Sequence, residues 1–438
     1  MYRRFGEVLA RELTFSVPLK ATSALPEIIV TARELRHDIS STKPYLVYLQ
    51  GGPGFPASPV QLGALPSWVP RALKDYRVLL LDQRGTAGPS SVTNQTLAEL
   101  DDDQKFDYLQ WFRADSIVRD CETIRKQLGV EQWSLLGQSY GGFVITHYLH
   151  VHPQSLAEVY FTGGLPIIKQ VDEGTPCAIS LYRATFKRVL KRNDKYYEKY
   201  PEDQALILKV VDYLRNHDVR LPGGGTLTPR RLQLLGIAFG FQGGYDKIHN
   251  LFQTAFVHQA LTNKEVLNVN FLRTVQQMES FETNPIYAIL HESIYCDGGS
   301  PSNWAAEQVK RELRDFDITE GGRFNFVGEM VFPFMFDDFE ELQPLKALAN
   351  RIAAHQWPAL YPTLDTTLLS APPKAAAAVY YDDMYVDHEF SVATAAALKP
   401  VDVKLWITNE FDHGGLRTNG EVILDRLIAL AKGSLEER

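Results

Sequence analysis

Short apolar segments alternate with helix-forming segments over the first 165 residues of the chain. Two segments have the apolar spacing of helices, 115–128 and 142–150, and they lie between runs that are almost continuously apolar. Such apolar runs are typical of strands buried on both faces of a parallel sheet. They are residues 45–49, 77–81, 133–136 and 157–161. Strands that alternate with helices predict an open α/β sheet with right-handed crossovers.

The beginning of the chain has a different pattern. Residues 10–19 and 27–37 alternate apolar with polar side chains. A period of two predicts half-buried strands, and their closeness in sequence predicts an antiparallel pair before the parallel sheet begins.

The pattern of apolar residues changes after residue 166 and again after residue 341, which divides the chain into three parts. Residues 167–341 lack short apolar runs and contain aromatic-rich helical stretches, which predicts a mainly helical insertion. After it, buried strands are expected at 375–381 and 401–408, and a closing helix at 420–431. We therefore predict a core in two parts, 1–166 and 342–438, with 167–341 inserted as a helical cap. A ligand site is expected under the cap, at the carboxyl ends of the strands.

The composition of the chain argues against some classes of binding partner. The chain has 438 residues and a formal net charge of −8, which argues against nucleic acid or an anionic membrane as the main partner. No run of 18 apolar residues and no secretion-signal pattern is present in the sequence. The three cysteines have no disulfide-framework or CxxC spacing, which suits the reducing cytoplasm. The sequence does not determine the oligomeric state, and a homo-oligomer stays open.

The strongest chemical signal is Gly-Gln-Ser-Tyr-Gly-Gly at 137–142. A strand, the pattern G-x-S-x-G and a helix in succession are typical of a nucleophile elbow, in which a strained turn lifts the serine hydroxyl above the sheet. The motif predicts Ser139 as a nucleophile and an α/β-hydrolase fold. The alternative is a tight turn with a purely structural role.

A glycine-rich loop follows the first buried strand. The sequence Gln-Gly-Gly-Pro-Gly at 50–54 lets a backbone N–H group point at a substrate oxygen. Together with the N–H of Tyr140, such a loop would stabilise a tetrahedral oxyanion. A simple glycine turn is the alternative.

The catalytic base is expected late in the chain, because this fold orders its triad as serine, acid, histidine. His413 follows the last predicted strand and precedes the closing helix. His388 and His355 compete with it, but His355 precedes the penultimate strand and His388 lies where the acid is expected.

The acid should follow the penultimate strand, where Asp382, Asp383 and Asp387 are the candidates. Its role is to hold the imidazole in the correct tautomer. Neighbours on an extended segment point in opposite directions. We favour Asp383, with Asp382 as the alternative, and expect the others to cap helices or to face solvent.

These motifs together resemble proline iminopeptidase (prolyl aminopeptidase), in its longer bacterial subgroup. The segments that carry the resemblance are 50–54, Asp-Gln-Arg-Gly-Thr-Ala-Gly at 82–88, 137–142 and the loop that contains His413. The 82–88 segment is the discriminating one, since lipases and esterases generally lack it. Its expected role is structural, as a strand-end turn with a buried pair of Asp82 and Arg84.

The resemblance implies roles for particular residues. Ser139 would be the nucleophile, His413 the base and Asp383 its partner, with the N–H groups of Gly52 and Tyr140 as oxyanion donors. Gln50 departs from the family pattern, in which histidine is common at this position; this affects the outer hydrogen bonding of the loop only.

An aminopeptidase must also bind the free ammonium group of its substrate. Carboxylates of the insertion would do this through charge-assisted hydrogen bonds. Glu292 and Glu329 are the candidates, because both lie among apolar or aromatic residues and the family uses insertion-domain glutamates in this way. The aromatic run Phe-Pro-Phe-Met-Phe at 332–336 is a candidate wall for a proline pocket. The alternative for both features is a structural role, in which the two glutamates bridge or cap helices and the aromatic run belongs to the hydrophobic core.

The resemblance thus implies a serine aminopeptidase that releases N-terminal proline from small peptides, and the serine elbow implies an acyl-enzyme. A serine esterase or amidase of other specificity is the alternative, and an uncharged cleft would favour it. A catalytically silent hydrolase fold used for binding is the third hypothesis, which would require a broken triad. No cofactor and no metal are expected, because no HExxH or clustered His/Cys pattern is present.

Overall fold

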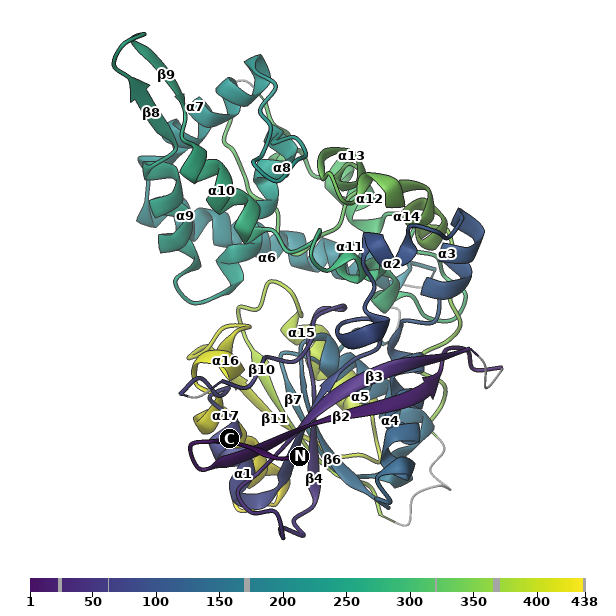
Figure 1. The fold of residues 1–438 in the computed structure, drawn as a ribbon. Helices are drawn as coiled ribbons and strands as arrows, with labels where there is room; N and C mark the ends of the chain where they lie inside the picture. The colour runs from purple at the N-terminus through teal and green to yellow at the C-terminus, as the bar shows by residue number, and fades with distance from the viewer. Residues whose placement is uncertain (23–25, 62, 169–173, 320, 365–370, 436–438) are drawn as a thin grey trace.

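In the computed structural model, a twisted sheet carries a layer of helices above its carboxyl-end edge (Figure 1). The structure describes residues 1–22, 26–61, 63–168, 174–319, 321–364 and 371–435. Parts of the expected insertion (169–173 and 320) and of the second core part (365–370 and 436–438) lie outside the described residues.

The described strands form one nine-stranded sheet and a separate hairpin. In spatial order the sheet consists of β1 (Arg3–Phe5), β2 (Val8–Pro18), β3 (Glu27–Arg36), β5 (Arg77–Asp82), β4 (Tyr45–Leu49), β6 (Trp133–Gln138), β7 (Leu156–Thr162), β10 (Lys374–Tyr380) and β11 (Val403–Thr408). Strands β1 to β3 and the β3–β5 pair are antiparallel, and all pairs from β5 to β11 are parallel. The mostly parallel sheet and its antiparallel beginning are therefore both confirmed.

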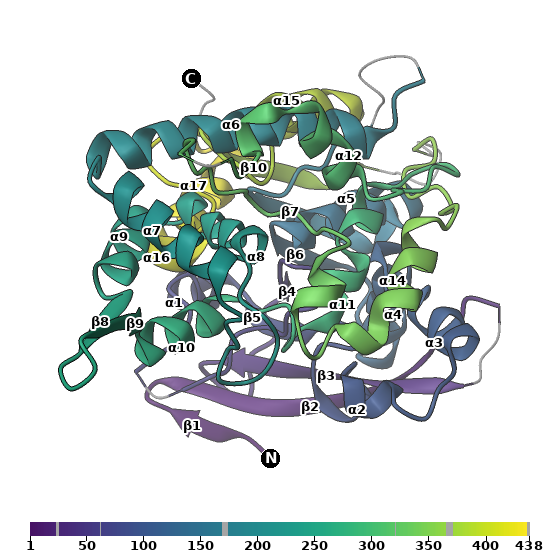
Figure 2. The same cartoon turned by 90° about the horizontal axis from the view of Figure 1, so that it is seen from above.

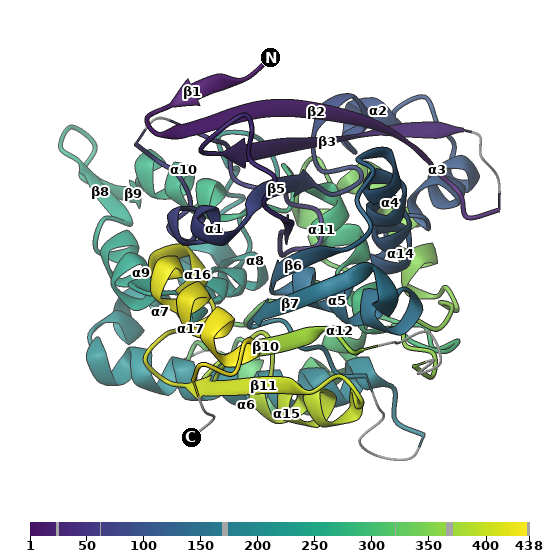
Figure 3. The ribbon, with the colours of Figure 1, turned by 90° about the horizontal axis from the view of Figure 1, so that it is seen from below.

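Helices cover both faces of the sheet, and the alternation of side chains along each strand explains why the strands are continuously apolar. Along β4, Leu46 and Tyr48 pack into the core beside α1 and α17, whereas Val47 and Leu49 pack into the core beside α4 and α5. Figure 3 shows these two helix pairs on opposite sides of the strands. The helices of this part are α1 (Val69–Asp75), α4 (Ala114–Gln127), α5 (Tyr140–Val151), α15 (His388–Ala397), α16 (Gly415–Thr418) and α17 (Gly420–Ala431).

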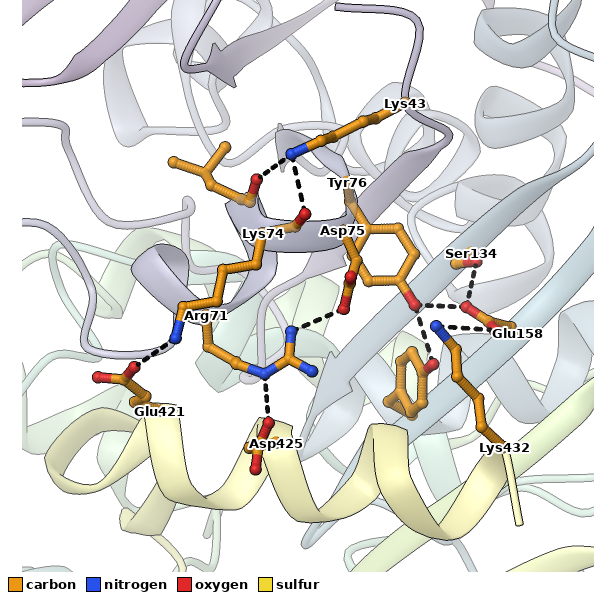
Figure 4. Close-up of polar contacts among 12 residues, drawn as sticks. Lys43, Arg71, Lys74, Asp75, Tyr76, Ser134, Glu158, Glu421, Asp425 and Lys432 are labelled. Atoms are coloured by element: carbon orange, nitrogen blue, oxygen red, sulfur yellow. Dashed lines mark hydrogen bonds and ion pairs between the residues drawn. The ribbon is translucent and has the colours of Figure 1, made fainter. Parts of the chain in front are cut away.

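The closing helix is joined to α1 by ion pairs (Figure 4). Arg71 pairs with Asp425, and Lys74 Nζ lies 3.3 Å from Glu421 Oε1. Such exposed pairs contribute little free energy, typically below about 1 kcal/mol each. The apolar contacts between these helices and the sheet therefore hold the C-terminal part in place.

The upper layer is mainly helical, as the sequence predicts for the inserted residues. Seen from above, its helices lie across the carboxyl ends of the central strands (Figure 2). It comprises α6 (Cys177–Lys199), α7 (Asp203–Asn216), α8 (Pro229–Gln233), α9 (Gly244–Gln253), α10 (Val269–Met278), α11 (Pro285–Leu290), α12 (Ala305–Glu312), α13 (Met335–Asp338), α14 (Lys346–Ala353) and the hairpin of β8 (Phe256–Gln259) and β9 (Lys264–Leu267). The domain limits at 166/167 and 341/342 stay a prediction.

Segments from outside 167–341 also contribute to this layer. Helices α2 (Asn94–Leu97) and α3 (Asp102–Leu109) lie beside α14 in Figure 1, and Arg351 pairs with Asp103. Short 3₁₀ helices complete the chain, η1 (Gly88–Ser90), η2 (Pro153–Ser155), η3 (Leu234–Gly240), η4 (Glu292–Tyr295), η5 (Arg314–Phe316) and η6 (Gln343–Leu345). None of the helices in the described part of the chain combines the length and the apolar character needed to cross a bilayer.

Candidate active site

Ser139 occupies a strained turn between β6 and α5. Its backbone has φ 54° and ψ −125°, a region that non-glycine residues rarely adopt. The surrounding glycines make the turn sterically feasible. A Cβ on Gly141 would lie 2.0 Å from the carbonyl oxygen of Leu49, and one on Gly142 would lie 2.2 Å from that of Gly164. The strand, turn and helix expected around the serine are thus all present.

His413 and Asp383 form a buried pair. The imidazole Nδ1 lies 2.7 Å from Asp383 Oδ2. The other carboxylate oxygen, Oδ1, accepts hydrogen bonds from the backbone N–H groups of Tyr385 and Val386, at 2.8 and 3.1 Å. Because the carboxylate is fixed from both sides, it holds the ring with Nε2 available for another partner.

The neighbouring carboxylates have other partners. Asp382 pairs with Lys195 at 3.0 Å and is partly exposed. Asp387 is the N-cap of α15 and pairs with Arg188. Of the three acids considered from the sequence, the structure brings Asp383 to His413.

The competing histidines lie in other surroundings. His388 contacts the Arg188 guanidinium, and its ring packs at 4.7 Å from that of Tyr381. His355 packs between the rings of Phe106 and Trp357. Neither residue lines the cavity that contains Ser139.

The pKa of His413 is set by opposing effects. Burial lowers it, but the charge of Asp383 and the hydrogen bond to it outweigh burial, so the net pKa is raised. The charge of Glu329 acts in the same direction as Asp383, and that of Arg417 acts against it. An imidazole beside a fixed carboxylate is thereby suited to accept a proton.

Ser139 and His413 line one cavity of about 800 Å³ together with the glycine-rich loop. Its remaining lining comes from both layers and comprises Gln50, Gly51, Gly52, Phe55, Pro56, Ala57, Ser58, Pro59, Gln138, Ile237, Ala238, Phe241, Gln242, Gly243, Gly244, Lys247, Met278, Ser280, Asn284, Tyr287, Glu329 and Arg417. The volume lies within the range of small-ligand sites, about 300–1,000 Å³.

The glycine-rich loop lies against the nucleophile turn. A Cβ on Gly51 would lie 2.8 Å from Ser139 Cβ, so the close approach requires glycine. Gln83 Nε2 donates to the carbonyl of Gln50 at 2.8 Å, and Tyr48 Oη donates to Gln50 Oε1 at 2.7 Å. Tyr140 begins α5, where backbone N–H groups have no partner inside the helix. Gly52 lines the same cavity as Ser139, and the role of Gly52 and Tyr140 as oxyanion donors stays a prediction.

Asp82 and Gln83 contact the segment that follows β4, and Asp82 does not pair with Arg84. Asp82 accepts from Arg33 at 2.8 Å and from the N–H of Ala57 at 3.0 Å. Arg84 instead makes a two-point contact with buried Asp120, with Nε 2.8 Å from Oδ2. The two residues have structural contacts, as expected, but the expected Asp82–Arg84 pair is wrong, since Asp82 pairs with Arg33 and Arg84 pairs with Asp120.

Glu329 is the carboxylate that the cap contributes to the cavity. Tyr287 Oη donates to its Oε1. Burial raises the pKa of Glu329 to about 7, although the nearby His413 and the hydrogen bond from Tyr287 both oppose the increase. The side chain lines the same cavity as Ser139 and His413.

Glu292 does not line this cavity. Its Oε1 accepts from the N–H of Ala306 at 2.8 Å and its Oε2 from that of Ala305 at 3.1 Å. These are the first N–H groups of α12, where a negative charge is favourable. The structure thus corrects the expectation that Glu292 binds substrate: it caps a helix, the structural alternative considered from the sequence.

The aromatic run at 332–336 is core. Phe332 and Phe336 are buried and neither lines the cavity. The aromatic lining comes instead from Phe55, Phe241 and Tyr287, which lie far apart in the sequence. The expected proline-pocket wall at 332–336 is therefore corrected as well. No local pattern marks the residues that replace it, because only the packing of cap on core brings them together.

Within the described residues, one group has metal-ligating side chains close together. Donor atoms of Glu202, Asp203 and His249 lie within 4.8 Å of one another. The Asp203 carboxylate already accepts hydrogen bonds from Tyr196 and Gln253. This group lies outside the lining of the Ser139 cavity.

The sheet, its crossovers and the serine turn define the chain as an α/β hydrolase. A family model described as alpha/beta hydrolase fold matches residues 44–207. Among solved structures, the crystal structure of esterase E22 aligns with 96% of this chain and 100% of its own, at 11% identity and a TM-score of 0.48.

Two curated relatives match nearly the whole chain. Proline iminopeptidase from Aeromonas sobria is 45% identical over 423 residues, 95% of each protein. Proline iminopeptidase aneH from Aspergillus aculeatus is 34% identical over 409 residues, 90% of this chain and 86% of that protein. The chain therefore belongs to the proline iminopeptidase family of hydrolases, which confirms the resemblance inferred from its motifs.

Proposed function

We propose that this protein is a serine aminopeptidase that releases N-terminal proline from peptides through an acyl-enzyme. The observation that carries the proposal is one cavity lined by Ser139, His413, the glycine-rich loop and Glu329. The family relationship supports the same activity, since both near-full-length relatives are proline iminopeptidases.

In this mechanism Ser139 attacks the carbonyl carbon of the N-terminal residue, and His413 accepts the serine proton. Asp383 holds the imidazole tautomer and stabilises the imidazolium. The N–H groups of Gly52 and Tyr140 stabilise the tetrahedral oxyanion, a contribution of about 3 kcal/mol per donor. His413 then gives the proton to the leaving amine, and water hydrolyses the acyl-enzyme.

Glu329 is the proposed anchor for the substrate ammonium. A carboxylate in the same cavity as the reacting serine favours an aminopeptidase over an esterase with an uncharged cleft. The aromatic side chains of Phe55, Phe241 and Tyr287 are the proposed apolar surface for the pyrrolidine ring.

A panel of aminoacyl arylamides tests the proposal, with wild-type protein and Ser139→Ala. We expect Pro-arylamide to be the preferred substrate, N-acetyl-Pro-arylamide to be refused and Ser139→Ala to be inactive on all. Equal cleavage of the blocked substrate would refute the ammonium anchor, and an active Ser139→Ala protein would refute the mechanism.

A further inference from the structure

A second, smaller pocket adjoins the proposed active-site cavity. Its volume is about 290 Å³, and it shares Gln50, Ser58 and Arg417 with the larger cavity. Its other walls are mainly apolar and include Leu65, Pro66, Trp68 and Leu416. The two spaces therefore meet at a polar junction, beyond which the surface is apolar.

Arg417 is the charged group at this junction. Its guanidinium lies 5.7 Å from the centroid of the Phe241 ring and is exposed. Among the residues that the structure describes, no carboxylate pairs with it. By contrast, Gln50 is engaged by Tyr48 and Gln83. Arg417 thus offers a planar, two-point donor to a ligand.

The backbone holds Arg417 at a fixed place relative to His413. Both lie in the short segment that ends in α16, and the Arg417 N–H donates to the carbonyl of Gly414 at 2.8 Å. The hydroxyl of Ser67 donates to the Arg417 carbonyl at 3.0 Å. The charge of Arg417 acts on both His413 and Glu329, which places it within electrostatic reach of the reacting groups.

We propose that the smaller pocket is the subsite for the leaving part of the peptide, and that Arg417 binds its C-terminal carboxylate. This inference rests on the proposed function, because it takes Glu329 as the ammonium site. A short peptide is a zwitterion, and the cavity offers a carboxylate from the cap and a guanidinium from α16. The substrate class is then free dipeptides with an apolar second residue, whose side chain contacts Leu65, Trp68 and Leu416.

The test compares Pro-Leu with Pro-Leu-amide, which differ only in the terminal charge. For wild-type protein we expect a KM about tenfold lower for Pro-Leu, the range of one charge-assisted hydrogen bond. Arg417→Gln should raise the KM of Pro-Leu about tenfold and leave that of Pro-Leu-amide within about twofold. Arg417→Lys should recover part of the difference, and added salt should raise the KM of Pro-Leu more than that of Pro-Leu-amide, because Pro-Leu has a second ion pair to lose.

Arg426→Gln is the matched control, since Arg426 is an exposed arginine on α17 that lies over Trp406. It should behave as wild type towards both peptides. Arg417 also lowers the pKa of His413, but loss of that effect would move the pH profiles of both peptides alike. Equal KM values in wild type, or equal changes in Arg417→Gln, would overturn the carboxylate subsite only. If wild type released proline from neither peptide, the proposed function would be refuted together with this inference.

Discussion

The proposed ammonium anchor gives the sharpest quantitative prediction. Glu329→Gln keeps the size and an acceptor for Tyr287 but removes the negative charge. Loss of one partner of a buried charge pair costs about 2–5 kcal/mol. Glu329 is only partly buried, so the lower end applies. About 2 kcal/mol corresponds to a roughly 30-fold loss of kcat/KM for Pro-arylamide.

The pH dependence provides a second readout. With a pKa of about 7 in the free enzyme, Glu329 is roughly 10% ionised at pH 6 and roughly 90% at pH 8. Activity should therefore rise with pH through about 7, on top of the rise caused by deprotonation of His413. In Glu329→Gln the Glu329 contribution disappears, and the His413 limb that remains is shallower and lies at lower pH, because the charge of Glu329 no longer raises the pKa of His413.

Glu292→Gln is the matched control, because burial also raises the pKa of Glu292 to about 7. It should leave kcat/KM and its pH profile unchanged and should lower the melting temperature through the weakened cap of α12. The assay is steady-state hydrolysis from pH 5.5 to 8, with circular dichroism to verify folding. A folded Glu329→Gln protein with wild-type KM and an unchanged profile would refute the reasoning.

Three further predictions follow from single contacts. Asp383→Asn should lower kcat by about 10⁴-fold by stabilising the wrong imidazole tautomer, whereas Asp382→Asn should remain active in the same assay; similar losses in both would contradict the assignment. Gly142→Ala should reduce folding yield and melting temperature, because its Cβ would clash with a backbone carbonyl; an unchanged melting temperature would contradict this. Asp120→Ala should lower the free energy of unfolding, measured with urea, by about 3–5 kcal/mol, because it leaves Arg84 buried without its carboxylate. A decrease below about 1 kcal/mol would contradict the importance of this pair.

The core could be predicted from the sequence because its strands are buried on both faces. Continuous apolar runs such as 77–81 are local patterns, and the structure places β5 at Arg77–Asp82. The serine turn was equally predictable, since close packing on either side of Ser139 requires glycines at fixed positions. Order along the chain then favoured His413, because this fold brings the loop after its last strand back to the serine.

Tertiary structure alone decided the partners of each charged group. Nothing local distinguishes Glu292 from Glu329, but the first lies at the start of α12 and the second faces the cavity. Likewise Arg84 reaches Asp120, 36 residues away, instead of Asp82. The burial and the hydrogen bonds of a charged side chain depend on which surfaces of cap and core pack together. Residue type and spacing along the sequence do not specify that packing.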